Sequence, residues 1–364
     1  MQAAALPLSE FTSRSRAPRL LALVNGAVLG SVTDAEVTSN NHYAADRFRA
    51  TAALAGDPVF GGAFWASGED IEVDIQFSLD GGASFTSLIR GTVDKVSLDP
   101  ATGLVHLEGR DLSAALIEAR TQEAFANRTA SEIATILAQR HGLAANVRTT
   151  TTPVGRYYQD EHDQITLDQF SFMTTEWDLL CNLARLEGFD VFVSGTSLNF
   201  QPAFVTPDVV LSVAPTDLVD LRMERCLTLA RGITVTVKSW NVRQQTAFAE
   251  TASLAGSGTA QSYVFVQPNL TPDQALNLAQ RKLAELAQHE RVIELTMPGE
   301  LTLTPRSMIA LNGTGTAFDQ SYFVDTIERR IGVGCGFVQR VRAKNVSSAG
   351  GAAGLSGLGN GSGA

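Results

Sequence analysis

The sequence has few cysteines and no long apolar run, and each absence excludes a class of protein. Its three cysteines, Cys181, Cys226 and Cys335, lie far apart in 364 residues, so they predict neither a disulfide framework nor a zinc knuckle. No apolar segment approaches the roughly 18 residues that a membrane-spanning helix needs. The N-terminus also lacks the basic and apolar regions of a secretory signal. We therefore expect no membrane span and a reducing compartment.

Basic residues are also scarce, and no block of Lys or Arg occurs. The chain has 28 Lys and Arg against 38 Asp and Glu, which gives a formal net charge of −10. Nucleic-acid binders need cations that displace counterions from the phosphates. This composition therefore argues against DNA binding, although DNA could pass close to such a protein without adhering to it.

No motif for catalysis or for a cofactor is present. The five histidines are scattered, and there is no HExxH pair, Gly-x-Ser-x-Gly elbow, phosphate loop or dinucleotide fingerprint. Asp160–Asp163 is the one group of metal-capable residues, but consecutive loop residues rarely point at one ion, which favours a solvated acidic loop. The glycines of Gly332–Gly336 fit a hairpin turn better than a phosphate loop. We expect no catalytic residues, no cofactor and no metal.

Residues 19–110 have the pattern of antiparallel β-structure. The Asn25-Gly26 pair between two apolar runs is typical of a hairpin. From Ile71 to Leu79, apolar and polar residues alternate, as in a half-buried strand. Closely spaced strands with short turns predict a barrel or sandwich.

The apolar, glycine-rich loop from Pro58 to Trp65 has two interpretations. Its aromatic residues could fold back onto the mouth of the barrel. Alternatively, Phe60, Phe64 and Trp65 could form a partner interface, because exposed aromatic patches mark such surfaces.

The middle of the chain changes to a helical period. Thr129 and Glu132 form a capping box that predicts a helix ending near Gly142. A second helix begins after Thr175 and ends at Gly188, and its wide apolar face from Trp177 to Leu186 predicts burial on most sides. Two short strands follow it, and residues 149–174 are predicted to be mainly loop.

A second β-rich block follows the helical section. It includes predicted strands at Leu227–Leu229 and at 322–331, and an exposed loop at 252–261. Thr271, followed by Pro, Asp and Gln, marks a helix start. The sequence thus predicts a mainly β protein with four parts, listed as a first antiparallel β-barrel domain at 1–111, a helical and α+β insert at 112–207, a second antiparallel β-barrel domain with one helix at 208–346, and a flexible Gly/Ser/Ala tail at 347–364.

Several segments together resemble the hub proteins of bacteriophage tail baseplates, a family that includes late control protein D, the hub of T4-like baseplates and the N-terminal part of type VI secretion spike proteins. The likeness covers most of residues 15–345 and rests on four segments, listed as Gly109–Leu116, Phe125–Ile133, the Trp-Asp-Leu-Leu element at 177–200 and Tyr322–Ile327. Two positions depart from the family. Arg306 stands where a glycine is usual, and a common histidine is replaced near Glu328-Arg329.

The resemblance implies a structural protein and not an enzyme. In such hubs, two similar barrels per subunit alternate around a channel, so that three copies form a pseudo-sixfold ring. The ring joins the hexameric tail tube, through a tube or distal tail protein, to a trimeric central spike and to other baseplate subunits. DNA passes through the lumen without specific binding. The implied location is the virion tail baseplate, assembled in the host cytoplasm.

Two other classes remain open. A receptor-binding β-protein of the tail would bind host cells selectively as an isolated chain. A cell-wall-degrading tail enzyme would need paired carboxylates in a cleft.

Overall fold

The computed structural model describes most of the chain. The described residues are 6–7, 16–55, 57, 59–121, 125, 128–151, 154, 175–203, 209–241, 246–256, 258–268, 270 and 272–346. The predictions made for Thr271, for the tail at 347–364 and for most of the loop at 149–174, which includes Asp160–Asp163, lie outside these residues.

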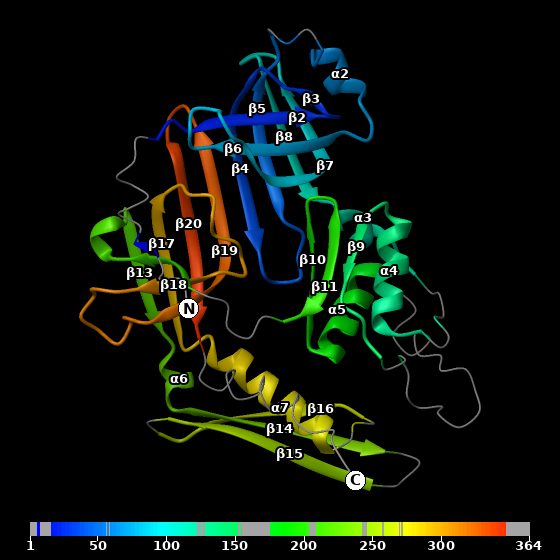
Figure 1. Cartoon of the computed structure of the whole chain (residues 1–364), viewed down its shortest axis with the longest axis vertical. Helices are drawn as coiled ribbons and strands as arrows, with labels where there is room; N and C mark the ends of the chain where they lie inside the picture. The colour runs from blue at the N-terminus through cyan, green and yellow to red at the C-terminus, as the bar shows by residue number, and fades with distance from the viewer. Residues whose placement is uncertain are drawn as a thin grey trace.

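Four units with separate cores make up the molecule (Figure 1). A first β-domain lies at the top of this view and a second β-domain below it. An insert of helices and short strands lies beside the second β-domain, and a small unit built around one long helix, here called the α7 unit, lies at the bottom. One 14-stranded sheet runs through both β-domains.

The first β-domain consists of antiparallel strands in the order β4-β5-β8-β7-β6-β2-β3. Its strands are β2 (Arg19–Val24), β3 (Ala27–Val28), β4 (Val32–Asn40), β5 (Arg47–Ala53), β6 (Glu72–Ser78), β7 (Thr86–Asp99) and β8 (Leu104–Asp111). The alternation predicted around Ile71–Leu79 is confirmed in β6, where Val73, Ile75 and Phe77 are buried. Asn25 and Gly26 both have positive φ, as the predicted turn requires. A short helix, α2 (Gly62–Ser67), interrupts the loop between β5 and β6.

The second β-domain shares a strand with the first. It contains β1 (Leu6–Pro7), β12 (Val209–Val213), a 3₁₀ turn η3 (Pro215–Asp217), β13 (Asp220–Arg225), β17 (Arg291–Pro298), β18 (Met308–Leu311), β19 (Ser321–Gly332) and β20 (Gly336–Asn345). The C-terminal half of β19 pairs with β4, from Thr326 opposite Asn40 to Gly332 opposite Asp34. Because Ile331 and Phe337 also enter the core of the first β-domain, the β19–β20 hairpin belongs to both domains.

The insert packs helices on a three-stranded sheet. Its elements are α3 (Ser113–Glu118), α4 (Ala130–Arg140), β9 (Ala144–Val147), α5 (Glu176–Glu187), β10 (Phe189–Ser194) and β11 (Ser197–Pro202). The predicted capping box of Thr129 and Glu132 is present, and Gly188 ends α5 in the left-handed conformation. Helix α5 is buried as predicted except at Leu186, which is 47% exposed.

The α7 unit departs from two predictions. It contains α6 (Leu227–Ala230), β14 (Gly232–Asn241), β15 (Thr246–Ala255), β16 (Gln261–Val266) and α7 (Pro272–Ala287). Residues 227–229 are helical, so the predicted strand there was wrong. The predicted loop at 252–261 is shorter, because β15 continues to Ala255. Small residues can continue a strand when the partner strand supplies the hydrogen bonds, as β14 does here.

The predicted fold class, mainly antiparallel β with an α+β section, is confirmed. In the first β-domain, β2 also lies against β4, so the sheet curls around its core, although no backbone pairing between these two strands is among the described ones. Within the described residues, none of the helices has the length and apolar character needed to cross a membrane.

Candidate functional site at the junction of the four units

The aromatic loop between β5 and β6 folds onto the first β-domain. Phe60 and Trp65 are each 3% exposed and belong to its core, and Phe64 packs edge-on against both rings. The Trp65 Nε1 donates a hydrogen bond of 2.9 Å to the carbonyl of Phe60. This is the first of the two interpretations of the loop. A partner contact made by Phe60, Phe64 and Trp65 would require the loop to open, and it stays a prediction.

We expect Trp65→Phe to lower the free energy of unfolding by about 1–2 kcal/mol, because a buried hydrogen bond and packed volume are lost. Denaturant titration of the variant measures this loss. Val59→Ala is the matched control, since Val59 is 63% exposed in the same loop. Unchanged stability combined with weaker association with tail proteins would instead support the partner-interface interpretation.

Tyr43 attaches the first β-domain to the insert. Its backbone has a φ of 56°, which turns the loop between β4 and β5 toward α5. The Trp177 Nε1 donates a hydrogen bond of 2.6 Å to the Tyr43 carbonyl, and the Arg185 guanidinium lies 5.2 Å from the Tyr43 ring centroid. Burial raises the pKa of the Tyr43 hydroxyl to about 12, so Tyr43 is neutral at physiological pH.

Arg306, from the loop before β18, connects the second β-domain to the same region. Its guanidinium carbon lies 3.4 Å from the ring centroid of Phe192 on β10, a close cation–π contact. Burial lowers the pKa of Arg306, and the carboxylates of Asp190 and Asp46 oppose that shift. The position was noticed in the sequence only as an exception to the family pattern. Here its cation interacts with Phe192 and Asp190 of the insert and with Asp46 of the first β-domain.

Arg306→Ala is expected to loosen the insert and to lower the free energy of unfolding by about 2 kcal/mol, the magnitude of a desolvated cation–π contact. Hydrogen exchange at residues 189–193 should rise more than exchange in β6. Arg222→Ala, on the exposed strand β13, serves as the control. Equal protection of β10 in the two variants would show that Arg306 does not hold the junction.

Two acidic side chains lie on the first β-domain side of this junction. Burial raises the pKa of Asp46 to about 6 and the pKa of Asp111 to about 7. The charge of Asp46 raises the pKa of Asp111 further, whereas hydrogen bonds from Ser113 act in the opposite direction. On the insert side, burial also raises the pKa of Asp190. The junction is thus rich in carboxyl groups that ionise with difficulty.

The α7 unit and the hairpin complete the junction. Arg281 of α7 donates a hydrogen bond of 2.8 Å from Nη1 to the Arg185 carbonyl at the end of α5. Asp325, buried at a bulge in β19, pairs with Lys344 at 2.6 Å and with His42 at 3.1 Å. All four units therefore meet through specific polar contacts.

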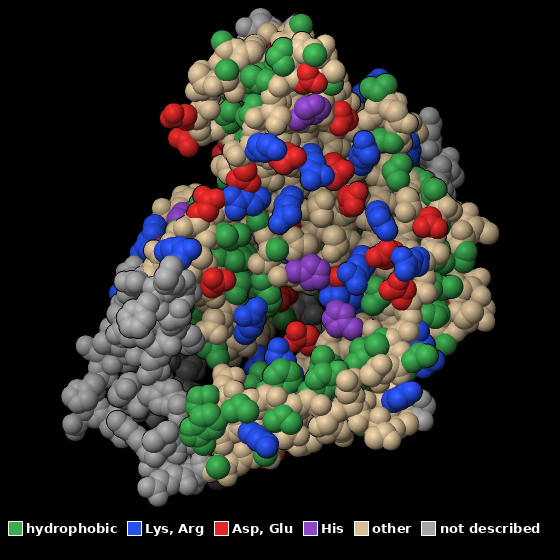
Figure 2. Space-filling model, turned by 180° about the vertical axis from the view of Figure 1, so that it is seen from behind, with side chains coloured by type: hydrophobic (Ala, Val, Ile, Leu, Met, Phe, Trp, Pro, Cys, Tyr) green, Lys and Arg blue, Asp and Glu red, His purple; other side chains and the backbone are tan. Residues whose placement is uncertain are grey.

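Charges on the outer face of the large sheet are paired across the strands. In one row, Arg330, Glu36, Arg49, Glu108 and Lys95 stand opposite one another on β19, β4, β5, β8 and β7. Arg49 lies 3.9 Å from Glu36 and 3.6 Å from Glu108. Figure 2 shows basic and acidic side chains intermixed over the upper half of the molecule. Each cation of this row therefore stands next to a carboxylate of the adjacent strand.

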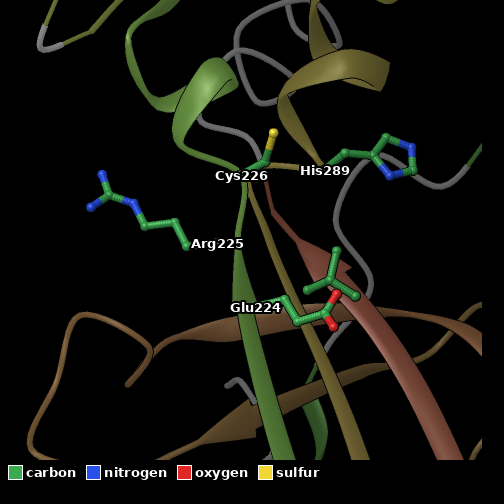
Figure 3. Close-up of a pocket in the computed structure, with 5 residues that line it drawn as sticks. Glu224, Arg225, Cys226 and His289 are labelled. Atoms are coloured by element: carbon green, nitrogen blue, oxygen red, sulfur yellow. The ribbon is translucent and has the colours of Figure 1, made fainter.

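An open depression of about 420 Å³ lies between the second β-domain and the α7 unit. Glu224, Arg225, Cys226, His289 and Val292 line it. The four labelled side chains point away from one another, so the Cys226 thiol and the His289 imidazole do not face each other (Figure 3). Burial and the neighbouring Lys344 lower the pKa of His289. Over the described ranges, no cluster of three His, Cys, Asp or Glu side chains could hold a metal ion.

The fold is the one found in phage tail proteins and in a component of a type VI secretion system. A tail protein from Neisseria meningitidis MC58 is similar with a TM-score of 0.68 and 16% identity over 90% of this chain and 96% of that chain. The 43 kDa tail protein of prophage MuSo2 from Shewanella oneidensis is similar with a TM-score of 0.65 and 18% identity, over 90% of this chain and 98% of that chain. An Escherichia coli type VI secretion component is described as structurally similar to the T4 tail proteins gp27 and gp5. It is similar to this chain with a TM-score of 0.54 and 12% identity, over 90% of this chain and 77% of that chain.

The family model described as the Alg8 N-terminal domain matches residues 58–332, and the chain belongs to this family. No curated protein matches the sequence.

Proposed function

We propose that this chain is a structural hub of a phage or phage-like tail baseplate. Three copies form a ring with six similar lobes, which joins the hexameric tail tube to a trimeric central spike and to neighbouring baseplate subunits. The chain works in the virion tail as a symmetry adaptor and as part of the DNA conduit, and it has no enzymatic role. The observation that carries the proposal is the fold, which matches tail proteins over nearly the whole length of both chains.

Surface charge supports the conduit. A wall over which phosphates move should offer no extended basic patch, since free cations would bind the DNA backbone. The chain has a net charge of −10, and Arg49 and Arg340 on the large sheet form ion pairs with glutamates of adjacent strands. Such a surface allows DNA to pass without specific binding.

The junction supports a rigid role. An adaptor transmits geometry only if its units keep their relative positions. Tyr43, Arg281, Arg306 and Asp325 connect the four units through hydrogen bonds, ion pairs and stacking. The labelled groups in the open depression, in contrast, do not converge on a point where a substrate could react.

Electron microscopy of the purified protein and of tails that contain it tests the proposal. We expect a threefold ring with six lobes and an open channel, seen down the tail axis. A chain that stays monomeric with tube and spike proteins present, or that binds elsewhere on the tail, would contradict the hub role. Turnover of cell-wall material by the purified chain would favour the enzymatic alternative.

A further inference from the structure

The three-stranded sheet of the α7 unit has two edges that pair with no other described strand. Helix α7 covers one face, where Ile233, Val235 and Val237 of the central strand β14 are fully buried. Strand β15 pairs only with β14 among the described strands, and so does β16 on the other side. Each edge therefore presents a row of backbone N–H and C=O groups that has no partner among the strands that the structure describes.

Neither edge carries the features with which monomeric proteins protect a free strand. Such features are charged side chains, above all Lys, together with Pro, bulges and short length. Strand β15 has ten residues, regular pairing and no Lys, Arg or Pro, and its one charged residue, Glu250, lies on the side of the sheet that faces α7. Strand β16 has no charged residue at all.

The outer face of the same sheet is also short of charge. Lys238 is the one charged residue among the outward-facing positions of the three strands. Trp240, Val264 and Val266 are 43%, 54% and 58% exposed. Hydrophobic side chains gather along the α7 unit in Figure 2. An uncharged face of this kind marks an interaction surface.

We propose that β15 of one subunit pairs with β16 of a second copy of this chain. Strand β15 runs antiparallel to β14 and β16 runs parallel to it, so β15 and β16 point in opposite directions. When equally oriented copies stand side by side around an axis, β15 of one then meets β16 of the next as an antiparallel pair. One repeated contact satisfies both edges, whereas a foreign strand would cover only one.

This contact is heterologous, because two different surfaces meet, and such contacts form rings when the rotation closes. It deepens the proposed function, since it rests on the proposed threefold ring and assigns part of its subunit interface to the α7 unit. The outer faces of the joined sheets then form one continuous surface on which Lys238 is the one charged residue that each described sheet contributes.

The test is the oligomeric state of the full chain by sedimentation velocity. We expect the wild type to form trimers and Val264→Lys/Val266→Lys to be monomeric. The variant should keep the circular dichroism spectrum of the wild type, because both side chains are exposed. Ala249→Glu on β15, added to the lysine variant, should restore association by opposite charge. Thr92→Lys/Ser97→Lys, on β7 of the first β-domain, is the matched control and should remain trimeric.

The outcomes separate the two proposals. Trimers that persist in the folded β16 variant would overturn the strand pairing and leave the hub role intact. A wild type that stays monomeric at its highest soluble concentration would overturn the pairing, and electron microscopy of assembled tails would then decide the hub role separately.

Discussion

Replacing Arg329 by alanine is expected to lower the free energy of unfolding by about 3–5 kcal/mol, because it leaves a buried carboxylate without its cation. Glu300 and Arg329 are 1% and 4% exposed. The Arg329 guanidinium donates hydrogen bonds to the carbonyls of Glu300 and Leu303, at 3.1 and 2.6 Å, and lies 3.6 Å from the Glu300 carboxylate. The substitution also leaves both carbonyls without this donor. Equilibrium unfolding in denaturant measures the loss.

The neighbouring residue supplies the control for this variant. Arg330 follows Arg329 on β19 but points to the exposed face, so Arg330→Ala should change stability by less than about 0.5 kcal/mol. Arg329→Met/Glu300→Gln should be more stable than Arg329→Ala, since no charge is then buried alone. Gln339 and the backbone of Leu303 can still donate to the amide oxygen of the new glutamine. Equal losses of unfolding free energy in Arg329→Ala and Arg330→Ala would contradict a stabilising role of the Arg329–Glu300 pair.

The stability of the wild type should fall as pH rises from about 4 to 8, largely through Asp111. Burial raises the pKa of this carboxyl in the folded state from 3.8 to about 7. Between these values the folded state holds a proton that the unfolded state has released, so rising pH favours unfolding. The difference between the two pKa values of Asp111 corresponds to a loss of about 4 kcal/mol in the free energy of unfolding between pH 4 and pH 8. Asp46, whose pKa burial raises to about 6, acts in the same direction.

Asp111→Asn should flatten most of this dependence. Asparagine stays neutral in both states, and its side-chain oxygen can accept the hydrogen bonds that Ser113 donates. The variant and the wild type should have similar stability at pH 4, and the variant should be the more stable at pH 8. Thermal unfolding across this pH range measures both curves. An unchanged slope in the variant would show that Asp111 is not the titrating group.

Elements with a strong local signal were predictable from the sequence. The capping box at Thr129, the glycine stop at Gly188 and the alternation of β6 each fix the backbone through neighbouring residues. Strands β4 and β5 had no such signal. Their inward positions include Ala35, Ser39 and Ala50, which are small, so hydrophobic contrast between the two faces is weak. These strands depend on pairing with distant segments.

The junction could not be predicted, because it depends on contacts between units far apart in the sequence. Arg306, Phe192 and Tyr43 share no local motif. The one signal in the sequence was Arg306, which stands where the family usually has a glycine. That difference did not indicate which residues Arg306 contacts. The edges of the α7 unit were hidden for the same reason, since a free edge is defined by the absence of a neighbouring strand.

The hairpin shared by the two β-domains sets an order of events during synthesis. Ile331 and Phe337 complete the core of the first β-domain, and β19 supplies the neighbour of β4. The N-terminal strands therefore leave the ribosome long before the β19–β20 hairpin that completes their core. The residues between them are synthesised while this core is still incomplete. Contacts of such sequence separation slow folding. The first domain to be made is thus the last to be finished, and a premature stop before β19 exposes its core.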